Sequence, residues 1–122
     1  MEPRHIHTTE SCQPATEILA RVGDKWSMLV VMLLGAGPRR FNQLKREVGT
    51  VSQRMLTLTL RGLERDGLVT RTVFPTVPPR VDYELTALGH SLSATVRVLA
   101  DWASANRPEI LIARAKFDAV ER

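Results

Sequence analysis

Arginine side chains recur on one face of a helix that the sequence predicts from Ser52 to Asp66. At about 100° per residue, the side chains divide into two opposite faces. One face holds Arg54, Leu58, Arg61 and Arg65, and the other holds Leu56, Leu60 and Leu63. A solvated helix would normally mix acidic residues among its basic ones, and the arginine face has none. A guanidinium group can donate two parallel hydrogen bonds to O6 and N7 of guanine, and a leucine can contact a thymine methyl group.

Five residues of this helix are predicted to reach base edges in a DNA major groove. Residues near the N-terminus of such a helix usually make these contacts, which adds the glutamine and the threonine that flank the arginine face. The base-reading candidates are Gln53, Arg54, Thr57, Leu58 and Arg61. The alternative is that the arginines only solubilise the helix and that Leu58 is an isolated exposed side chain.

Positive charge is concentrated in the middle of the chain. Residues 39–80 contain nine basic and three acidic residues, a net charge of +6, whereas the rest of the chain carries −2. This asymmetry indicates a surface that meets a polyanion, although a solvated charged face would have the same composition. Contacts to the phosphate backbone, which position a protein without reading sequence, are predicted for Arg40, Lys45, Arg46, Ser52, Arg65, Arg71 and Arg80.

The elements predicted around the basic segment follow the order of a winged helix, a mainly α-helical fold with a small β-hairpin. Periodicity and capping residues indicate helices over about 14–22, 25–34, 41–48, 52–66, 87–106 and 108–120, with strands over 68–74 and 81–85. The turn at Gly49 between two helices is typical of a helix-turn-helix. We therefore expect a flexible tail over residues 1–12 and a single winged-helix domain over residues 13–122. The helix-turn-helix would occupy about 41–66 and the wing about 68–86.

Several other classes of protein are excluded or disfavoured. No apolar run approaches the ~20 residues of a membrane-spanning helix, and the first eleven residues have no apolar secretion signal. A single cysteine fits a reducing, cytoplasmic compartment. The phosphate-binding loops and hydrolase signatures of common enzymes are absent, so we predict no enzymatic activity and no cofactor. His5 and His7 alone are far from a closed metal site, and we predict none.

Five segments of the sequence resemble the HxlR-type branch of the MarR-like winged-helix regulators. The matching motifs are Gly23–Trp26, Arg40–Leu44, Ser52–Leu56, Leu60–Val69 and Val77–Thr86, within a similarity that covers about residues 12–103. The resemblance implies a bacterial transcription regulator that binds double-stranded DNA as a homodimer on an inverted-repeat operator. It also implies that the dimer is built from helices over about 13–22 and 87–121. The alternative for the long helix is packing within its own subunit.

Cys12 is a candidate redox switch. In the resembling family a cysteine often stands just before the first helix and commonly precedes a proline, whereas here Gln13 separates Cys12 from Pro14. A helix N-terminus favours the thiolate, but a lone cysteine needs a partner subunit or a small thiol to form a disulfide. A passive thiol is the alternative, and a small-molecule or oxidant effector is left open. A winged helix that binds an acidic protein instead of DNA is the rival from another class.

Overall fold

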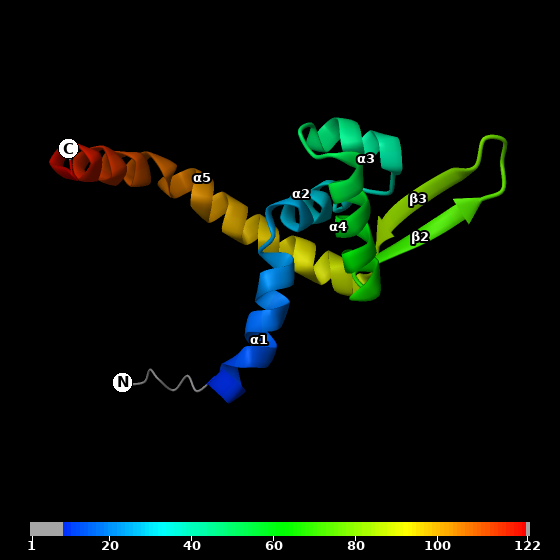
Figure 1. Cartoon of the computed structure of the whole chain (residues 1–122), viewed down its shortest axis with the longest axis horizontal. Helices are drawn as coiled ribbons and strands as arrows, with labels where there is room; N and C mark the ends of the chain where they lie inside the picture. The colour runs from blue at the N-terminus through cyan, green and yellow to red at the C-terminus, as the bar shows by residue number, and fades with distance from the viewer. Residues whose placement is uncertain (1–8, 122) are drawn as a thin grey trace.

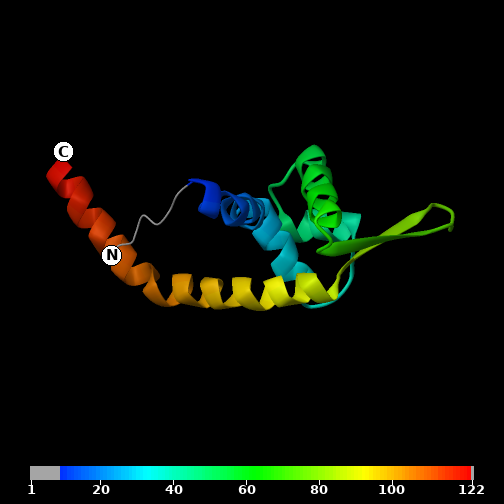
Figure 2. The ribbon, with the colours of Figure 1, turned by 90° about the horizontal axis from the view of Figure 1, so that it is seen from below.

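The computed structural model describes the backbone of residues 9–121 and the side chains of residues 14–121. The elements are α1 (Thr9–Val22), α2 (Lys25–Leu34), β1 (Arg39–Arg40), α3 (Phe41–Val48), α4 (Gln53–Arg65), β2 (Val69–Phe74), β3 (Arg80–Leu85) and α5 (Ala87–Glu121). Helices α2, α3 and α4 pack together with the first part of α5. The β2–β3 hairpin and the C-terminal end of α5 project from this body in opposite directions (Figures 1 and 2). The mainly helical winged-helix fold predicted from the sequence is confirmed.

Helix α2 lies at the centre of the core. Its N-terminus is capped by Asp24, whose carboxylate accepts a hydrogen bond from the Ser27 backbone N–H at 3.1 Å. Val30, Val31 and Leu34 of this helix are at most 1% exposed. Burial of these apolar side chains against α3, α4 and α5 stabilises the body from which the other elements project.

Helix α4 is anchored by the predicted leucine face. Its buried hydrophobic residues are Leu56, Leu60 and Leu63, each at most 1% exposed. Ser52 caps the helix by accepting a hydrogen bond from the Met55 backbone N–H at 3.0 Å. After the helix, Gly67 adopts a φ of 77°, a conformation that glycine tolerates best, and this turn directs the chain into β2.

A three-stranded antiparallel sheet forms the wing, where the sequence predicted only a hairpin. The strand order is β1-β3-β2, and β1 pairs Arg39 with Tyr83 and Arg40 with Asp82. A two-residue strand has too few positions to show alternation, so its sequence carried no recognisable strand pattern. The proline-rich segment between β2 and β3 makes the tip, where the side chain of Val77 is 99% exposed.

Two predicted helix boundaries were wrong. Helix α1 begins at Thr9, so residues 9–12 belong to a helix instead of a tail; the proline at position 14 costs one backbone hydrogen bond without ending it. The two helices predicted after the wing form one helix, α5, with Pro108 inside. Proline fits the helical φ and removes only one donor, which typically bends a helix. Figure 2 shows α5 bending in its orange part.

Helix α5 is long but carries charged residues along its length. Within residues 9–121, no helix combines the length and the apolar composition needed to cross a lipid bilayer. The body contacts α5 mainly through its first part, where Ser93 and Val96 are buried. Beyond residue 100, nearly all of its described side chains are exposed. The far half of α5 is therefore a free-standing rod in the single chain (Figure 1).

Candidate nucleic-acid interface

The face of α4 opposite the leucines is open to solvent. All five predicted base-reading residues are exposed, and Leu58 has 52% of its surface accessible. The hydroxyl group of Thr57 donates a hydrogen bond to the Gln53 carbonyl oxygen at 2.9 Å, which leaves its methyl group and its oxygen lone pairs for an outside contact. Because the leucines are buried and the arginines are exposed, the helix presents its basic face outward as the sequence predicted.

Most of the predicted DNA-contacting cations have no acidic partner within the part of the chain that the structure describes. Among the described residues, no ion pair involves Arg40, Lys45, Arg46, Arg54, Arg61 or Arg65. All of these side chains are exposed except that of Lys45, which is half-buried. An unpaired, solvated cation can replace the counterions of a DNA phosphate without first breaking a contact of its own.

Two of the predicted phosphate contacts are instead partly shielded by carboxylates. The Arg71 Nε lies 3.9 Å from Glu64 Oε1, and both side chains are more than 40% exposed, so this pair is weak. The Arg80 Nε lies 3.2 Å from Asp82 Oδ1, its Nη2 donates to Asp82 Oδ2 at 3.4 Å, and its guanidinium stacks on Phe74 at 4.3 Å from the ring centre. The Arg80 side chain is thus held by two other residues of the wing, which its position in the sequence did not indicate.

Arg39 is shielded in the same way. Its Nε donates to Glu47 Oε1 at 3.1 Å, and its Nη1 donates to the carbonyl oxygens of Gly37 and Pro38. These contacts tie the start of β1 to α3. Arg39 therefore has a structural partner for its charge, in contrast to its neighbour Arg40.

A groove of about 980 Å³ separates the start of α3 from the wing tip. Its basic lining consists of Arg40, Arg46 and Arg80, and Asn42 and Gln43 line it as well. The two amides are not among the contacts predicted from the sequence, although their place in the first turn of α3, beside unpaired backbone N–H groups, was a usable signal. The groove has the charge and the hydrogen-bond donors that a phosphate backbone requires.

Tyr83 supports the sheet behind this surface. It lies on β3, opposite Arg71 of β2 and Arg39 of β1, and only 9% of it is exposed. Burial raises the pKa of its hydroxyl group, and this effect exceeds the lowering by the nearby Arg71. The tyrosine therefore remains neutral over the physiological pH range and acts as part of the core.

A second cavity, of about 410 Å³, lies between α5 and the body. Apolar side chains of α2 line it together with apolar, polar and charged residues of α3 and α5: Leu29, Met32, Leu33, Glu47, Val48, Ser93, Arg97, Ala100 and Asp101. Its volume is within the range of small-molecule sites, which typically begin at about 300 Å³. Nothing in its lining selects a particular ligand.

Large apolar side chains remain exposed on the helices predicted to form the dimer. On α5 these include Val98, Leu99 and Trp102, with exposed fractions of 70%, 53% and 58%. On α1, Ile18 and Leu19 are 57% and 64% exposed. The alternative of packing within one subunit requires these side chains of α5 to be buried in the single chain. They are not buried there.

Two sequence-based hypotheses lie outside the described residues. His5 and His7 precede residue 9, and Cys12 is described only as part of the α1 backbone. Among the described residues, no group of three potential metal ligands occurs.

Comparisons with known proteins agree with this architecture. The HxlR-like helix-turn-helix family model matches residues 21–110. The HTH-type transcriptional regulator YtfH of Escherichia coli is 44% identical over 105 residues, which cover 86% of this chain and 82% of that protein. A solved structure described as the transcriptional regulator ytfH from Salmonella typhimurium shares 42% identity and a TM-score of 0.79, covering 84% of this chain and 91% of that one.

Another similar solved structure is that of a protein described as a redox regulator. The redox regulator HypR in its reduced form has a TM-score of 0.75 and 39% identity, covering 82% of this chain and 98% of that one. The family model extends over the helix-turn-helix, the wing and most of α5. The chain is therefore a transcriptional regulator that belongs to the HxlR-like helix-turn-helix family.

Proposed function

We propose that this chain binds a specific double-stranded DNA operator, with α4 in the major groove and the wing beside the flanking backbone. The observation that carries the proposal is the exposed face of α4, where Arg54 and Arg61 have no acidic partner among the described residues. Each of these guanidinium groups would donate two hydrogen bonds to one guanine. Such a contact favours the correct base over others by ~1–3 kcal/mol. Gln53, Thr57 and Leu58 are the auxiliary readers.

The phosphate contacts come from two sides of α4. Lys45 and Arg46 hold the backbone from α3 and Arg40 from the residue before it, while Ser52 and Arg65 hold it from the two ends of α4. The shielded Arg71 and Arg80 contribute less, because each would first have to weaken its contact to a carboxylate. These contacts make binding depend on salt without adding sequence preference.

The regulator acts as a homodimer in this proposal. The exposed apolar residues of α1 and α5 would be buried against a second copy. Two-fold symmetry then places the two α4 helices in successive major grooves, about 10 base pairs apart, on an inverted repeat.

Selection of bound fragments from genomic DNA, followed by titration of two variants, tests the proposal. Arg61→Ala should reduce the preference for the selected site over random duplex, while Lys45→Ala should weaken both alike. Equal losses with both DNAs for both variants would contradict the assigned roles. Absence of saturable duplex binding by the wild-type protein, over a range of salt concentrations, would favour a protein-binding adaptor instead.

A second candidate is control of this DNA binding by thiol oxidation at Cys12. The similarity to the redox regulator HypR favours it, and Cys12 is the only cysteine of the chain. Oxidation would therefore join two subunits or attach a small thiol. Operator affinity should change after mild diamide treatment of the wild-type protein and remain constant for Cys12→Ser. Unchanged wild-type affinity would remove the switch and leave the DNA-binding proposal intact.

A further inference from the structure

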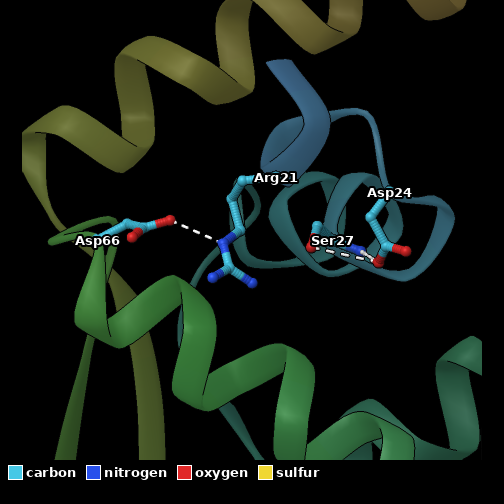
Figure 3. Close-up of polar contacts among 4 residues, drawn as sticks. All are labelled: Arg21, Asp24, Ser27 and Asp66. Atoms are coloured by element: carbon cyan, nitrogen blue, oxygen red, sulfur yellow. Dashed lines mark hydrogen bonds and ion pairs between the residues drawn. The ribbon is translucent and has the colours of Figure 1, made fainter. Parts of the chain in front are cut away.

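A polar contact joins α1 to the C-terminal end of α4. The Arg21 Nε donates to Asp66 Oδ2 at 2.8 Å, across 45 positions in the sequence, and Asp66 is the residue that ends α4. Figure 3 shows Arg21 extending from α1 toward this carboxylate. The two side chains are 36% and 26% exposed, so the pair is partly desolvated.

The same guanidinium lies directly against the backbone of α4. A Cβ atom placed on Gly62 would be 2.8 Å from the Arg21 Cζ and closer still to its Nη1. Real Cβ atoms essentially never make such contacts, so a side chain at position 62 would push the flexible end of Arg21 away from α4. Arg21 thus contacts α4 at Gly62 and again one turn later at Asp66.

This contact lies on the edge of the base-reading face. At about 100° per residue, Gly62 and Asp66 share one side of α4, between the leucine face and the arginine face. Gly62 follows Arg61 directly. A tilt of the body, and of α4 with it, relative to α1 would therefore displace the arginine side chains relative to the bases.

The turn after α4 is also bonded to Thr86, the residue that precedes α5. The Thr86 hydroxyl donates to the Gly67 carbonyl oxygen at 2.6 Å, and the Thr86 backbone N–H donates to the Leu68 carbonyl oxygen at 3.0 Å. The junction after α4 is thus held by Thr86, just before α5, on one side and by Arg21 of α1 on the other. On the α1 side, Arg21 and Asp66 both line cavities of about 480 and 300 Å³, so the surroundings of the pair are loosely packed.

We propose that Arg21 is a positioning residue for DNA recognition, which fixes the orientation of α4 relative to α1 through Gly62 and Asp66. This inference rests on the proposed DNA binding and deepens it. The guanidinium does not contact DNA; it holds the base-reading helix in register with the helix proposed to bind a second subunit. Loss of the contact weakens the selected operator more than it weakens random duplex.

Three variants test this role: Arg21→Met, which keeps the length of the side chain; Asp66→Asn, which removes the acceptor charge; and Gly62→Ala, which displaces the guanidinium while keeping both charges. The readout is the ratio of operator affinity to random-duplex affinity, measured well below each melting temperature. We expect this ratio to fall about tenfold for a dimer that loses the contact twice, and random-duplex affinity to change little. Arg21→Met combined with Asp66→Asn should cost no more than either change alone.

Arg97→Met is the matched control, because Arg97 is exposed on α5 and outside the proposed DNA surface. It should leave the ratio unchanged. An unchanged ratio in Arg21→Met, or equal losses on both DNAs with a smaller salt dependence, would overturn the positioning role while leaving operator binding established. A wild-type protein that binds no duplex would overturn both proposals.

Discussion

The shielding of some arginines and not others leads to a quantitative prediction about salt. Arg46 is exposed, lines the groove between α3 and the wing, and has no acidic partner among the described residues. Each phosphate contact contributes about 0.9 to the slope of log affinity against log salt, so Arg46→Ala should reduce the slope by ~1.8 in a dimer. Between 50 and 200 mM salt, the difference in affinity between wild type and variant should therefore shrink about tenfold.

Arg39→Ala is the comparison, because it removes the same charge from a nearby position. The Arg39 guanidinium is already bonded to Glu47 and to two backbone carbonyl groups, so it should add little to the slope. Fluorescence anisotropy with a labelled random duplex at several salt concentrations measures both slopes, and thermal melting checks that both variants are folded. Equal slopes for the two variants would refute the distinction between shielded and free arginines.

Three further variants test the structure behind the surface. Leu60→Ala should lower the free energy of unfolding by ~2–5 kcal/mol in denaturant titrations, because it empties a site in the α4 anchor that is 1% exposed. Gly67→Ala should lower the free energy of unfolding by about 1 kcal/mol. The cause is backbone strain alone, since φ is 77° and a Cβ there would meet nothing within 4 Å. The raised pKa of Tyr83 means that the folded state keeps a proton that the unfolded state releases near pH 10, so stability should fall above that pH. The melting temperature of Tyr83→Phe should decline less between pH 9 and 11 than that of the wild type.

Helix α4 was predictable from the sequence because its two faces are chemically distinct. Buried positions of α4 repeat at helical spacing as leucine, so periodicity alone identified which side is anchored. Local capping signals at Ser52 and Gly67 also fixed the ends of the helix to within one residue. Both signals depend only on residues close together in the chain.

Features that depend on distant residues were not predictable. β1 exists only because Arg39 and Arg40 meet β3, more than forty positions later. The contact of Arg21 with Asp66 likewise spans 45 positions, and neither side chain is unusual in its own segment. A proline usually marks a helix boundary, so the sequence predicted a break before Pro108, yet α5 continues through it. A proline removes one donor from a helix, and the remaining hydrogen bonds can sustain it with a bend.

The burial of α4 constrains how DNA binding by this chain could be regulated. Its three anchoring leucines are at most 1% exposed, and they pack against a core that spans α2, α3 and the sheet. Packed cores shift between discrete arrangements and do not deform freely, so α4 cannot turn independently within the body. A signal that altered operator binding would therefore have to move the whole body relative to its supports. Arg21 of α1 and Thr86 before α5 both contact the short junction at the end of α4, so such a movement would change the contacts there.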